Sequence, residues 1–571
     1  MAKRVSVEST AEAYLELLAS RGVDYFFGNA GTDFAPLIEA FEKRQTQGQH
    51  LPRPLTVPHE TVAVAMAHGY TMVTGRPQAV MVHVIVGAAN ALAGVINAAR
   101  CQVPMLFTAG RNPLTEAGLP GSRNRQIHWA QESFDQGGMM REWVKWDYEL
   151  RNFVQLETVV DRALAITQAE PQGPVYLMLP REVLAEHHDV FEYSESSRAP
   201  QPAETVAAPD AIRRAAELLA EARHPLIVTK GAGRDPGAVA ALVRLAEACG
   251  AAVVENSPTY MNFPQDHPLH AGFEVGPHLE AADAIVVVEC DAPWFPALQQ
   301  PRPETRLIQI GVDPLFVRYP IRGFGGDVAL AGAPRLTMAA LADAVAGSAS
   351  DQAAVATRRD RWAELHRRQR ESWLAAGRKT EADAPLDMKW VSRCVADVLD
   401  DRTIVVNEYD LDHTQASFRT PGTYFGSPQS GGLGWGVGSA LGVKLAKPDH
   451  TVICCVGDGS YMFGAPTAAH FVGRAHDLPV LYVVFNNRAW NAVKRAVQSH
   501  APEGWTARTG HMPLSDLEPA PDYEMVCQAS GGYGERVESP AELPAALQRA
   551  LRAVRDEKRQ ALLNVVCKKP A

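Results

Sequence analysis

The chain has 571 residues, of which 46% are hydrophobic and 21% charged, and its formal net charge is -10 at pH 7. The length predicts about three or four domains with sizeable cores, and the acidic balance gives no reason to expect a nucleic acid partner. The chain begins without the apolar segment of a secretory signal and contains no run of about 18 uncharged apolar residues, so we expect a cytoplasmic protein with no membrane association.

Residues 1–192 are predicted to form a first α/β domain. Ser9 and Glu12 have the spacing of a capping box for a helix that ends near Ser20. An apolar strand at residues 23–27 is followed by a loop at residues 28–32. In a parallel sheet such a loop lies at the carboxyl ends of the strands, where ligands bind. The loop is therefore a candidate ligand-binding segment.

An acidic residue, Glu60, follows the next predicted strand and opens an alanine-rich helical stretch at residues 61–70. An acid in the first turn of a helix is ordinarily explained by its favourable interaction with the helix dipole. A carboxyl group among apolar neighbours would instead have a raised pKa and could exchange a proton. The sequence alone leaves both readings open.

A histidine and an asparagine mark the following strand and helix, at residues 83–91. His83 lies at the predicted strand end and Asn90 one helical segment later. An imidazole can exchange a proton near neutral pH, which makes His83 a candidate acid or base. The competing interpretation is a core histidine with satisfied hydrogen bonds.

A central α/β domain is predicted at residues 205–347, after a linker rich in Ser, Pro, Ala and Glu. Short apolar strands separated by helical stretches predict it, at residues 225–230, 251–255, 284–289 and 306–310. A glycine-rich turn at residues 231–234 follows the first of these strands and is too short a signal to indicate a ligand. A second linker, residues 348–385, leads to a C-terminal domain at residues 386–571.

The C-terminal domain contains the most specific motif. A continuous apolar strand at residues 451–456 ends in Gly457-Asp458-Gly459-Ser460, and a second strand at residues 479–485 ends in Asn486-Asn487. Gly-Asp-Gly alone is most often a turn. Two strand ends that bring a carboxylate and an amide to one edge of a sheet instead suit Mg²⁺, which takes one or two carboxylates and leaves its other positions to phosphate oxygens and water.

This order of strand, Gly-Asp-Gly-Ser, helix, strand and Asn-Asn resembles the signature of the thiamine diphosphate (ThDP) enzymes. The resemblance covers essentially the whole chain. Residues 83–91 and 171–180 look most like the benzoylformate decarboxylase branch of the 2-oxo acid decarboxylase/acetolactate synthase family. The resemblance implies an α/β fold of three doubly wound parallel-sheet domains. The N-terminal domain would bind the pyrimidine, the second domain would lie in the centre, and the C-terminal domain would bind the diphosphate with Mg²⁺.

The resemblance also implies roles for individual residues. Glu60 matches the glutamate that activates the aminopyrimidine, and Leu433 matches the bulky residue that holds the cofactor bent. The Mg²⁺ ligands would be Asp458, Asn487 and the carbonyl oxygen of Ala489. The other cofactor-binding positions would be Asn90, Asp410, Leu411, Gly431, Gly457, Gly459, Ser460 and Trp490. Ala492, Val493 and Ala496 would continue from Trp490 into a helix along the substrate pocket.

Four further residues are expected to face the substrate. His83 is the expected acid or base, Thr32 stands where the branch has a serine that contacts the substrate carboxylate, and His128 and Gln131 stand where relatives place a polar pocket residue. Two departures from the pattern matter. Leu298 stands where the branch carries a second catalytic histidine. An aspartate at position 410 would be repelled by a neighbouring diphosphate, unless the loop contributes backbone N–H groups or turns Asp410 away.

The implied reaction is the ThDP- and Mg²⁺-dependent, non-oxidative decarboxylation of a 2-oxo acid through a C2 ylide and an enamine, with carboligation to a second carbonyl favoured by the missing histidine. The alternative is an acetolactate synthase-like transferase, with or without a non-redox FAD. The presence of Glu60, Leu433, Asp458 and Asn487 argues against a non-catalytic ThDP-binding protein. In this family the two half-sites come from different subunits, which implies a homodimer at least and usually a homotetramer.

Overall fold

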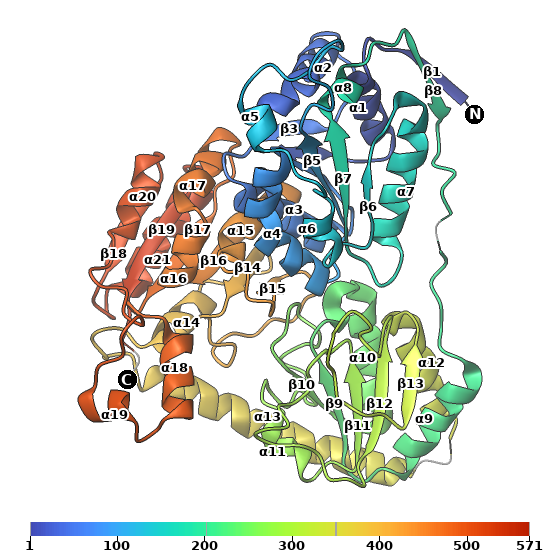
Figure 1. Ribbon diagram of the computed structural model, residues 1–571. Coiled ribbons are helices and arrows are strands. Elements are labelled where there is room, and N and C mark those ends of the chain that lie inside the picture. The colour runs from blue at the N-terminus through green and yellow to red at the C-terminus, as the bar shows by residue number, and fades with distance from the viewer. Residues whose placement is uncertain (1, 201, 349–350, 570–571) are drawn as a thin grey trace.

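The computed structural model describes residues 2–200, 202–348 and 351–569, which form three α/β domains built on parallel sheets. The predicted fold class is therefore confirmed. Figure 1 shows the first domain at the top, the central domain at the lower right and the C-terminal domain at the left. An extended segment joins the first domain to the central one, and a long helix runs from the central to the C-terminal domain.

The first sheet has six parallel strands in the order β3-β2-β4-β5-β7-β6. Its strands are β2 (Tyr25–Gly28), β3 (Arg53–Thr56), β4 (Ala79–Val82), β5 (Met105–Arg111), β6 (Asp147–Glu149) and β7 (Pro174–Pro180). Its helices are α1 (Thr10–Ser20), η1 (Thr32–Phe34), α2 (Ala35–Thr46), α3 (Glu60–Thr74), α4 (Val84–Arg100), α5 (Ile127–Ala130), α6 (Gly138–Arg141), η2 (Phe153–Gln155), α7 (Leu156–Gln168) and α8 (Arg181–Ala185). The predicted cap is present, because the Ser9 side chain accepts a hydrogen bond from the Glu12 N–H.

The C-terminal sheet has six parallel strands in the order β15-β14-β16-β17-β19-β18. Its strands are β14 (Thr403–Glu408), β15 (Tyr424–Gly426), β16 (Thr451–Gly457), β17 (Leu481–Asn486), β18 (Tyr533–Val537) and β19 (Ala561–Val566). Its helices are α14 (Met388–Ala396), α15 (Trp435–Ala446), α16 (Asp458–Phe463), α17 (Pro466–Ala475), α18 (Asn491–His500), α19 (Trp505–Thr509), α20 (Tyr523–Ala529) and α21 (Leu543–Arg555). Numbered within each domain, both six-stranded sheets read 2-1-3-4-6-5, so the two outer domains share one topology.

The central sheet has five parallel strands in the order β10-β9-β11-β12-β13. Its strands are β9 (Pro225–Thr229), β10 (Ala252–Glu255), β11 (Ala284–Val288), β12 (Arg306–Gly311) and β13 (Val328–Ala331). Its helices are α9 (Pro209–Glu221), η3 (Ala232–Arg234), α10 (Pro236–Cys249), α11 (Gly276–Leu279) and α12 (Pro334–Ala346), and α13 (Gln352–Arg378) leads onward. The sequence patterns predict four of these strands and miss β13, whose four residues alternate between buried and exposed.

The first and C-terminal domains are joined by close packing of α3 on α15. A Cβ atom at Gly69 would lie 2.2 Å from the Ser439 carbonyl oxygen, and one at Gly442 would lie 1.9 Å from the Met66 carbonyl oxygen. Only glycine fits at such separations, because the helix backbones themselves are in contact. The contact fixes the start of α3, at Glu60, relative to the start of α15.

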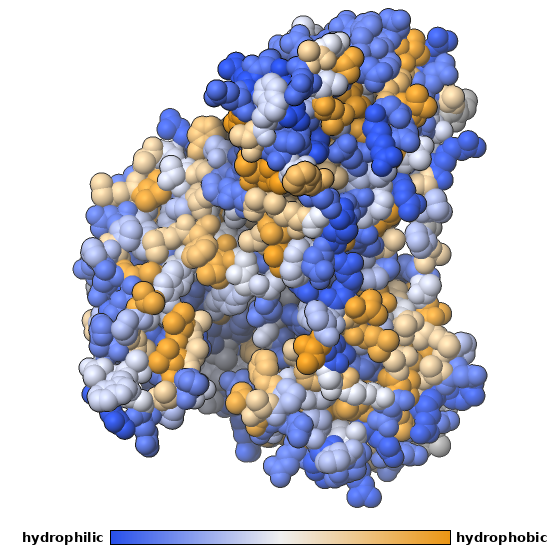
Figure 2. Space-filling view, in the orientation of Figure 1, coloured by the Kyte–Doolittle hydropathy of each residue, from blue (hydrophilic) through white to orange (hydrophobic). Residues whose placement is uncertain are grey.

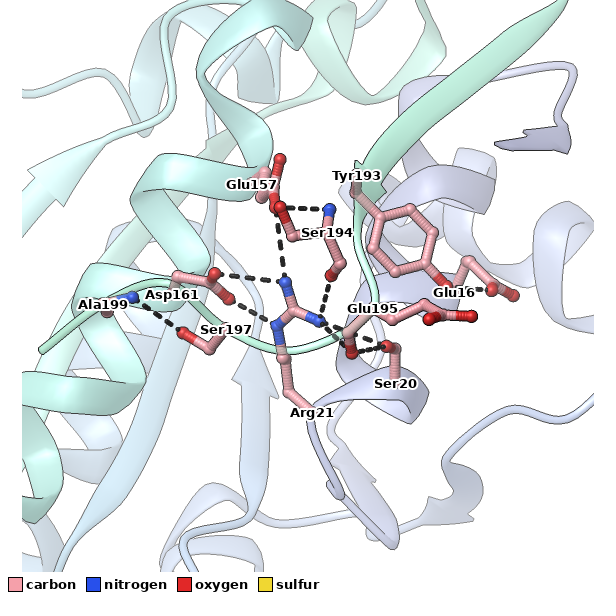
Figure 3. A network of polar contacts seen from close by, with 10 residues as sticks. All are labelled: Glu16, Ser20, Arg21, Glu157, Asp161, Tyr193, Ser194, Glu195, Ser197 and Ala199. Atoms are coloured by element: carbon pink, nitrogen blue, oxygen red, sulfur yellow. Dashed lines mark hydrogen bonds and ion pairs between the residues drawn. The ribbon is translucent and has the colours of Figure 1, made fainter. Parts of the chain in front are cut away.

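The chain leaving the first domain is held by a buried arginine. β1 (Ala2–Ser6) pairs antiparallel with β8 (Val190–Ser194), a pairing that the sequence patterns miss. Figure 3 shows Arg21 at the centre of the contacts beside β8: its Nε donates to Asp161 Oδ1 at 2.6 Å, and its Nη1 donates to the Ser194 carbonyl oxygen at 2.9 Å. The Arg21 side chain is only 4% exposed. It therefore ties α1, α7 and the outgoing strand together.

No helix in the described part of the chain (2–200, 202–348 and 351–569) has both the length and the apolar character needed to span a bilayer.

Replacing Arg21 by alanine is expected to destabilise the first domain by about 3 to 5 kcal/mol, because it leaves the buried Asp161 carboxylate without its partner. Calorimetry should show a lower unfolding temperature for that domain. Arg4→Ala is the matched control, since its pair with Glu192 joins β1 to β8 with side chains 71% and 64% exposed. An exposed pair contributes less than about 1 kcal/mol. Equal shifts for the two variants would contradict this account.

Candidate functional site

The candidate residues gather at the same topological position in the two outer domains. In each six-stranded sheet the strand order reverses between two neighbouring strands, β2 and β4 in the first and β14 and β16 in the last. The loops that leave these strands depart to opposite faces, which opens a crevice at their carboxyl ends. His83 directly follows β4, and Asp458 directly follows β16. The topology therefore places one candidate at each crevice.

In the C-terminal crevice, Asp458 and Asn487 lie on two sides of one turn. Asp458 Oδ2 accepts the Arg488 N–H at 2.7 Å, and Asn487 Oδ1 accepts the Ala489 N–H at 2.9 Å. Arg488 has a left-handed φ of 57°, which folds the chain back between them. The strand ends thus meet as the spacing predicts. A carboxylate, an amide oxygen and a backbone carbonyl are the hard donors that suit Mg²⁺, so these residues fit the ion.

The two glycines of the motif are required by close contacts. A Cβ atom at Gly457 would lie 2.5 Å from Asp410 Oδ2, and one at Gly459 would lie 2.2 Å from the ring of Trp490. Trp490 is the residue before α18, where a pocket residue is predicted. Ser460 lies in α16, one residue beyond Gly459 and largely buried. The two glycines therefore let the side chains of Asp410 and Trp490 pack against the backbone of the motif.

Three buried carboxyl groups converge on this crevice. Burial, followed by the charges of Asp458 and Glu408, raises the pKa of Asp410 to about 8. Burial raises the pKa of Glu408 to about 7 and that of Asp458 to about 6. Asp410 is turned toward Gly457 and not away from the site, but at neutral pH its carboxyl group is largely protonated. It therefore does not carry the charge that would repel a diphosphate.

The neighbouring Leu411 serves the structure of its own loop. Its side chain is 2% exposed and packs in the core, and its N–H donates to Asn407 Oδ1 at 3.0 Å. The structure therefore gives Leu411 no free donor for a ligand, in contrast to the cofactor contact predicted for it.

Glu408 is a residue that the sequence motifs did not single out. Its Oε1 accepts the Gly434 N–H at 2.7 Å and its Oε2 accepts the Gly436 N–H at 2.6 Å, so it caps the start of α15. The sequence feature that could have indicated Glu408 is its position at the end of a predicted buried strand.

The loop that carries Leu433 is clamped from the first domain. Asn97, on α4, donates from Nδ2 to the Gly432 carbonyl oxygen at 2.8 Å, and its Oδ1 accepts the Ser430 hydroxyl at 2.7 Å. Gly431 and Gly434 on either side have left-handed φ values of 78° and 84°. Leu433 is half-buried between them. Its position thus depends on a contact between domains that no local pattern reveals.

In the first domain, Glu60 opens α3 and pairs with α4. Asn90 Nδ2 donates to Glu60 Oε2 at 2.6 Å, so two predicted site residues 30 positions apart are in contact. Glu60 is half-buried and Asn90 is exposed. The bond orients one carboxylate oxygen and leaves the other available.

His83 lies between an acid and an amide. Its Nδ1 is 2.5 Å from Asp33 Oδ1, and its Nε2 is 3.4 Å from Gln131 Nε2. His128 is 2% exposed, and its Nδ1 accepts the Asn124 N–H at 3.2 Å, so it supports its own loop. Thr32 is exposed at the start of η1. Asp33, the residue after Thr32, is the other residue that sequence reasoning missed.

The two half-sites are separate in the single chain. Among the described residues, no hydrogen bond or ion pair joins Glu60 or His83 to the turn that holds Asp458 and Asn487.

Three family models match consecutive parts of the chain. They are described as the N-terminal TPP binding domain (residues 8–139), the central domain (residues 212–341) and the C-terminal TPP binding domain (residues 409–565) of thiamine pyrophosphate enzymes. Thiamine pyrophosphate (TPP) is another name for ThDP. Together the three matches span most of the sequence.

Individual proteins are similar over nearly the full length. The acetolactate synthase isozyme 3 large subunit of Escherichia coli is 25% identical, over 96% of this chain and 93% of its own length. The benzoylformate decarboxylase of Pseudomonas aeruginosa is 26% identical, over 96% of this chain and 98% of its own. The solved structure of a ThDP-dependent 4-hydroxybenzoylformate decarboxylase from Rhodococcus jostii RHA1 has a TM-score of 0.78 at 24% identity, covering 98% of this chain and 99% of that one, and shows the shared fold.

Mg²⁺ binding is expected to weaken as the pH falls through about 6. Burial raises the pKa of Asp458 to about 6, so below that pH a proton competes with the ion for the carboxylate. Calorimetric titration with Mg²⁺ in the presence of ThDP, repeated at several pH values, measures this. Asp458→Asn should abolish the binding and its pH dependence, whereas the exposed Asp477→Asn should change neither. Binding by Asp458→Asn equal to that of the unchanged protein would exclude Asp458 as a ligand.

Proposed function

This chain belongs to the thiamine pyrophosphate enzyme family, and from that premise we propose that it is a ThDP- and Mg²⁺-dependent 2-oxo acid decarboxylase with carboligase capacity. The observation that carries the proposal is the pair of equivalent crevices, one with Glu60 and His83 and the other with Asp458 and Asn487. Each crevice holds the residue types that one half of the cofactor requires. A protein that merely bound ThDP would have no need of Glu60.

The first-domain residues would activate the cofactor and handle the substrate. When bound, ThDP supplies a nucleophilic carbon for the keto group and an electron sink for the bond to CO₂. Glu60, oriented by Asn90, would exchange a proton with the aminopyrimidine ring. His83 would exchange a proton with the substrate, aided by Gln131, and Thr32 would offer its hydroxyl to the substrate carboxylate.

The C-terminal residues would hold the diphosphate. Asp458, Asn487 and the Ala489 carbonyl would bind Mg²⁺, and the backbone around Gly457, Gly459 and Ser460 would approach the phosphate oxygens. Asp410, kept neutral by burial, would lie beside them. Leu433 would support the bent cofactor from the loop that Asn97 clamps.

Carboligation is favoured by the residue at position 298. Leu298 lies on a surface turn with its side chain 80% exposed and has no proton to donate. With leucine at position 298 in place of the second histidine of the benzoylformate decarboxylase branch, protonation of the decarboxylated carbon would slow. Attack of that carbon on an acceptor aldehyde or keto acid would then compete with release of the free aldehyde.

The second candidate is an acetolactate synthase-like transferase, with or without a non-redox FAD. Two observations support it: the similarity to acetolactate synthase subunits, and a cavity of about 270 Å³ at the glycine-rich turn after β9. The cavity is lined by Lys230, Gly231, Arg234 and Asp291, among others. Lys230 and Asp291 pair across it at 2.7 Å, which occupies part of the polar lining.

We further propose that the active unit is at least a homodimer, and we expect a homotetramer. Among the described residues, no hydrogen bond or ion pair joins Glu60 or His83 to the turn of Asp458 and Asn487, and a second copy would bring the two half-sites together. Figure 2 shows apolar side chains exposed over all three domains on one face. Large exposed apolar residues include Phe134 in the first domain and Trp505 and Leu514 in the C-terminal domain, at 111%, 78% and 94% exposure.

Proton NMR of the products decides between the two candidates. We expect CO₂ loss and a free aldehyde from the protein with ThDP, Mg²⁺ and either benzoylformate or pyruvate, and an acyloin when an aldehyde is added. The readout is the ratio of aldehyde to ligated product. Acetolactate as the main product from pyruvate would favour the transferase. A purified protein that is yellow and releases FAD would favour it further.

Glu60→Gln is expected to leave ThDP binding within about threefold, because the amide keeps the size and one hydrogen-bond acceptor. Turnover should fall by at least about 100-fold, since the amide cannot exchange the proton. Binding is read from calorimetric titration and turnover from CO₂ release. Unchanged turnover would remove the role of Glu60.

Mixing two inactive variants tests whether the half-sites come from different subunits. A hybrid of Glu60→Gln and Asp458→Asn subunits has one intact site if the site is shared, and none if each chain builds its own. Activity should therefore reappear after the two variants are unfolded and refolded together, and not in either variant refolded alone. Sedimentation of an active monomer would contradict the dimer.

A further inference from the structure

Asp33 and His83 form a buried pair inside the first-domain crevice. Asp33 is 3% exposed, and its Oδ1 lies 2.5 Å from His83 Nδ1. Its other oxygen, Oδ2, accepts the Val84 N–H at 3.4 Å. An ionised carboxylate only accepts hydrogen bonds, so the imidazole must carry its proton on Nδ1. The free ring nitrogen, Nε2, then faces Gln131 and the crevice.

The backbone around the pair is adapted to this contact. A Cβ atom at Gly31 would lie 2.1 Å from His83 Nδ1, and one at Gly110 would lie 1.7 Å from Asp33 Oδ2. Any side chain at either position would force the carboxylate or the ring out of place. Val84, which follows the histidine, has a left-handed φ of 31°, which is strained for a β-branched residue. Three unrelated segments are therefore shaped around one hydrogen bond.

We propose that Asp33 is a positioning residue for the reaction: it fixes His83 as the Nδ1–H tautomer and thereby makes Nε2 the atom that exchanges protons with the substrate. The proposal rests on the role given to His83 under the proposed function. In the protonating direction, the Nε2–H bond breaks, the proton moves to the substrate carbon or oxygen, and the electron pair of that bond stays on Nε2. The ring becomes neutral with its Nδ1–H still donated to Asp33, and water returns the Nε2 proton.

The acidic groups around His83 favour its protonated form, whereas burial opposes it. The hydrogen bond to Asp33 raises the pKa of His83 above its ordinary value, and Glu60 at the start of α3 adds to this. His128 on α5 is also coupled to the ring, and a positive charge on one of the two histidines disfavours a positive charge on the other; burial lowers the pKa of His128. His83 thus keeps its second proton at a higher pH than an isolated imidazole.

The pH dependence of His83 carbethoxylation tests the pair without using turnover. Diethyl pyrocarbonate modifies only neutral imidazole, and peptide mass spectrometry separates His83 from His128 within one sample. In the full-length protein we expect a His83 midpoint above about 6.5, which falls by about 1 unit or more in Asp33→Asn. Gln131→Ala is the matched control, because it removes the neutral partner on Nε2 and should shift the midpoint much less.

The outcomes separate this inference from the proposed function. An Asp33→Asn midpoint equal to that of the unchanged protein overturns the pair. If Asp33→Asn does not fold, a His83 midpoint in the unchanged protein that is no higher than that of His128 overturns it instead. A lowered midpoint together with an equal shift in the pH profile of kcat/KM supports both. A lowered midpoint with an unchanged kcat/KM profile supports the pair and removes His83 from the proposed reaction.

Discussion

The direct contact between α3 and α15 is the constraint on which the arrangement of both half-sites depends. Glycines at 69, 438 and 442 let the two helices touch through their backbones, and a Cβ atom at any of them would lie 2.8 Å or less from the neighbouring helix. Contact this close is rigid, because neither helix can slide without a backbone clash. Glu60 begins one helix, and the loop that carries Leu433 leads into the other. The glycines thus set the relative positions of Glu60 and the Leu433 loop, which the functional residues do not set themselves.

The shared topology of the outer domains explains why two sites exist in one chain. Both sheets have the same strand order, and in each the connections from two neighbouring strands leave to opposite sides, at β2 and β4 in the first and at β14 and β16 in the last, which opens a crevice there. The two crevices have opposite chemistry. One presents an imidazole with an acid partner, and the other gathers three carboxyl groups whose pKa values are raised mainly by burial. A repeated fold therefore presents two chemically different crevices, one in each of the two TPP binding domains.

Burial accounts for the electrostatics of the second crevice. Asp410 looked unfavourable beside a diphosphate when only its residue type was considered. In the structure it lies against Gly457, and desolvation, followed by the charges of Asp458 and Glu408, raises its pKa to about 8, so that it is largely protonated at neutral pH. The family similarity and the geometry thus agree on a cofactor site, and the local charge does not oppose it.

Much of this could be predicted from the amino-acid sequence. The apolar strands, the Gly-Asp-Gly and Asn-Asn motifs and Glu60 after a strand end are local patterns of two or more adjacent residues. They carried the resemblance to the ThDP enzymes, and that resemblance implied the fold class and most candidate positions. Strand β13 and the pairing of β1 with β8 were missed, since short or edge strands have weak patterns. Leu411 was assigned a ligand contact that its buried side chain and internally bonded N–H do not offer.

Only the tertiary structure could show the partners of those residues. Asp33 meets His83 across 50 positions, Asn97 reaches Gly432 across 335, and Glu408 caps a helix 26 residues away. The physical reason is that a hydrogen bond depends on distance in space, which folding sets through sheet order and helix packing. The sequence by itself determined which chemical groups are present and at which strand ends they stand. The tertiary structure decided which of them touch, and hence which are buried, paired and able to exchange a proton.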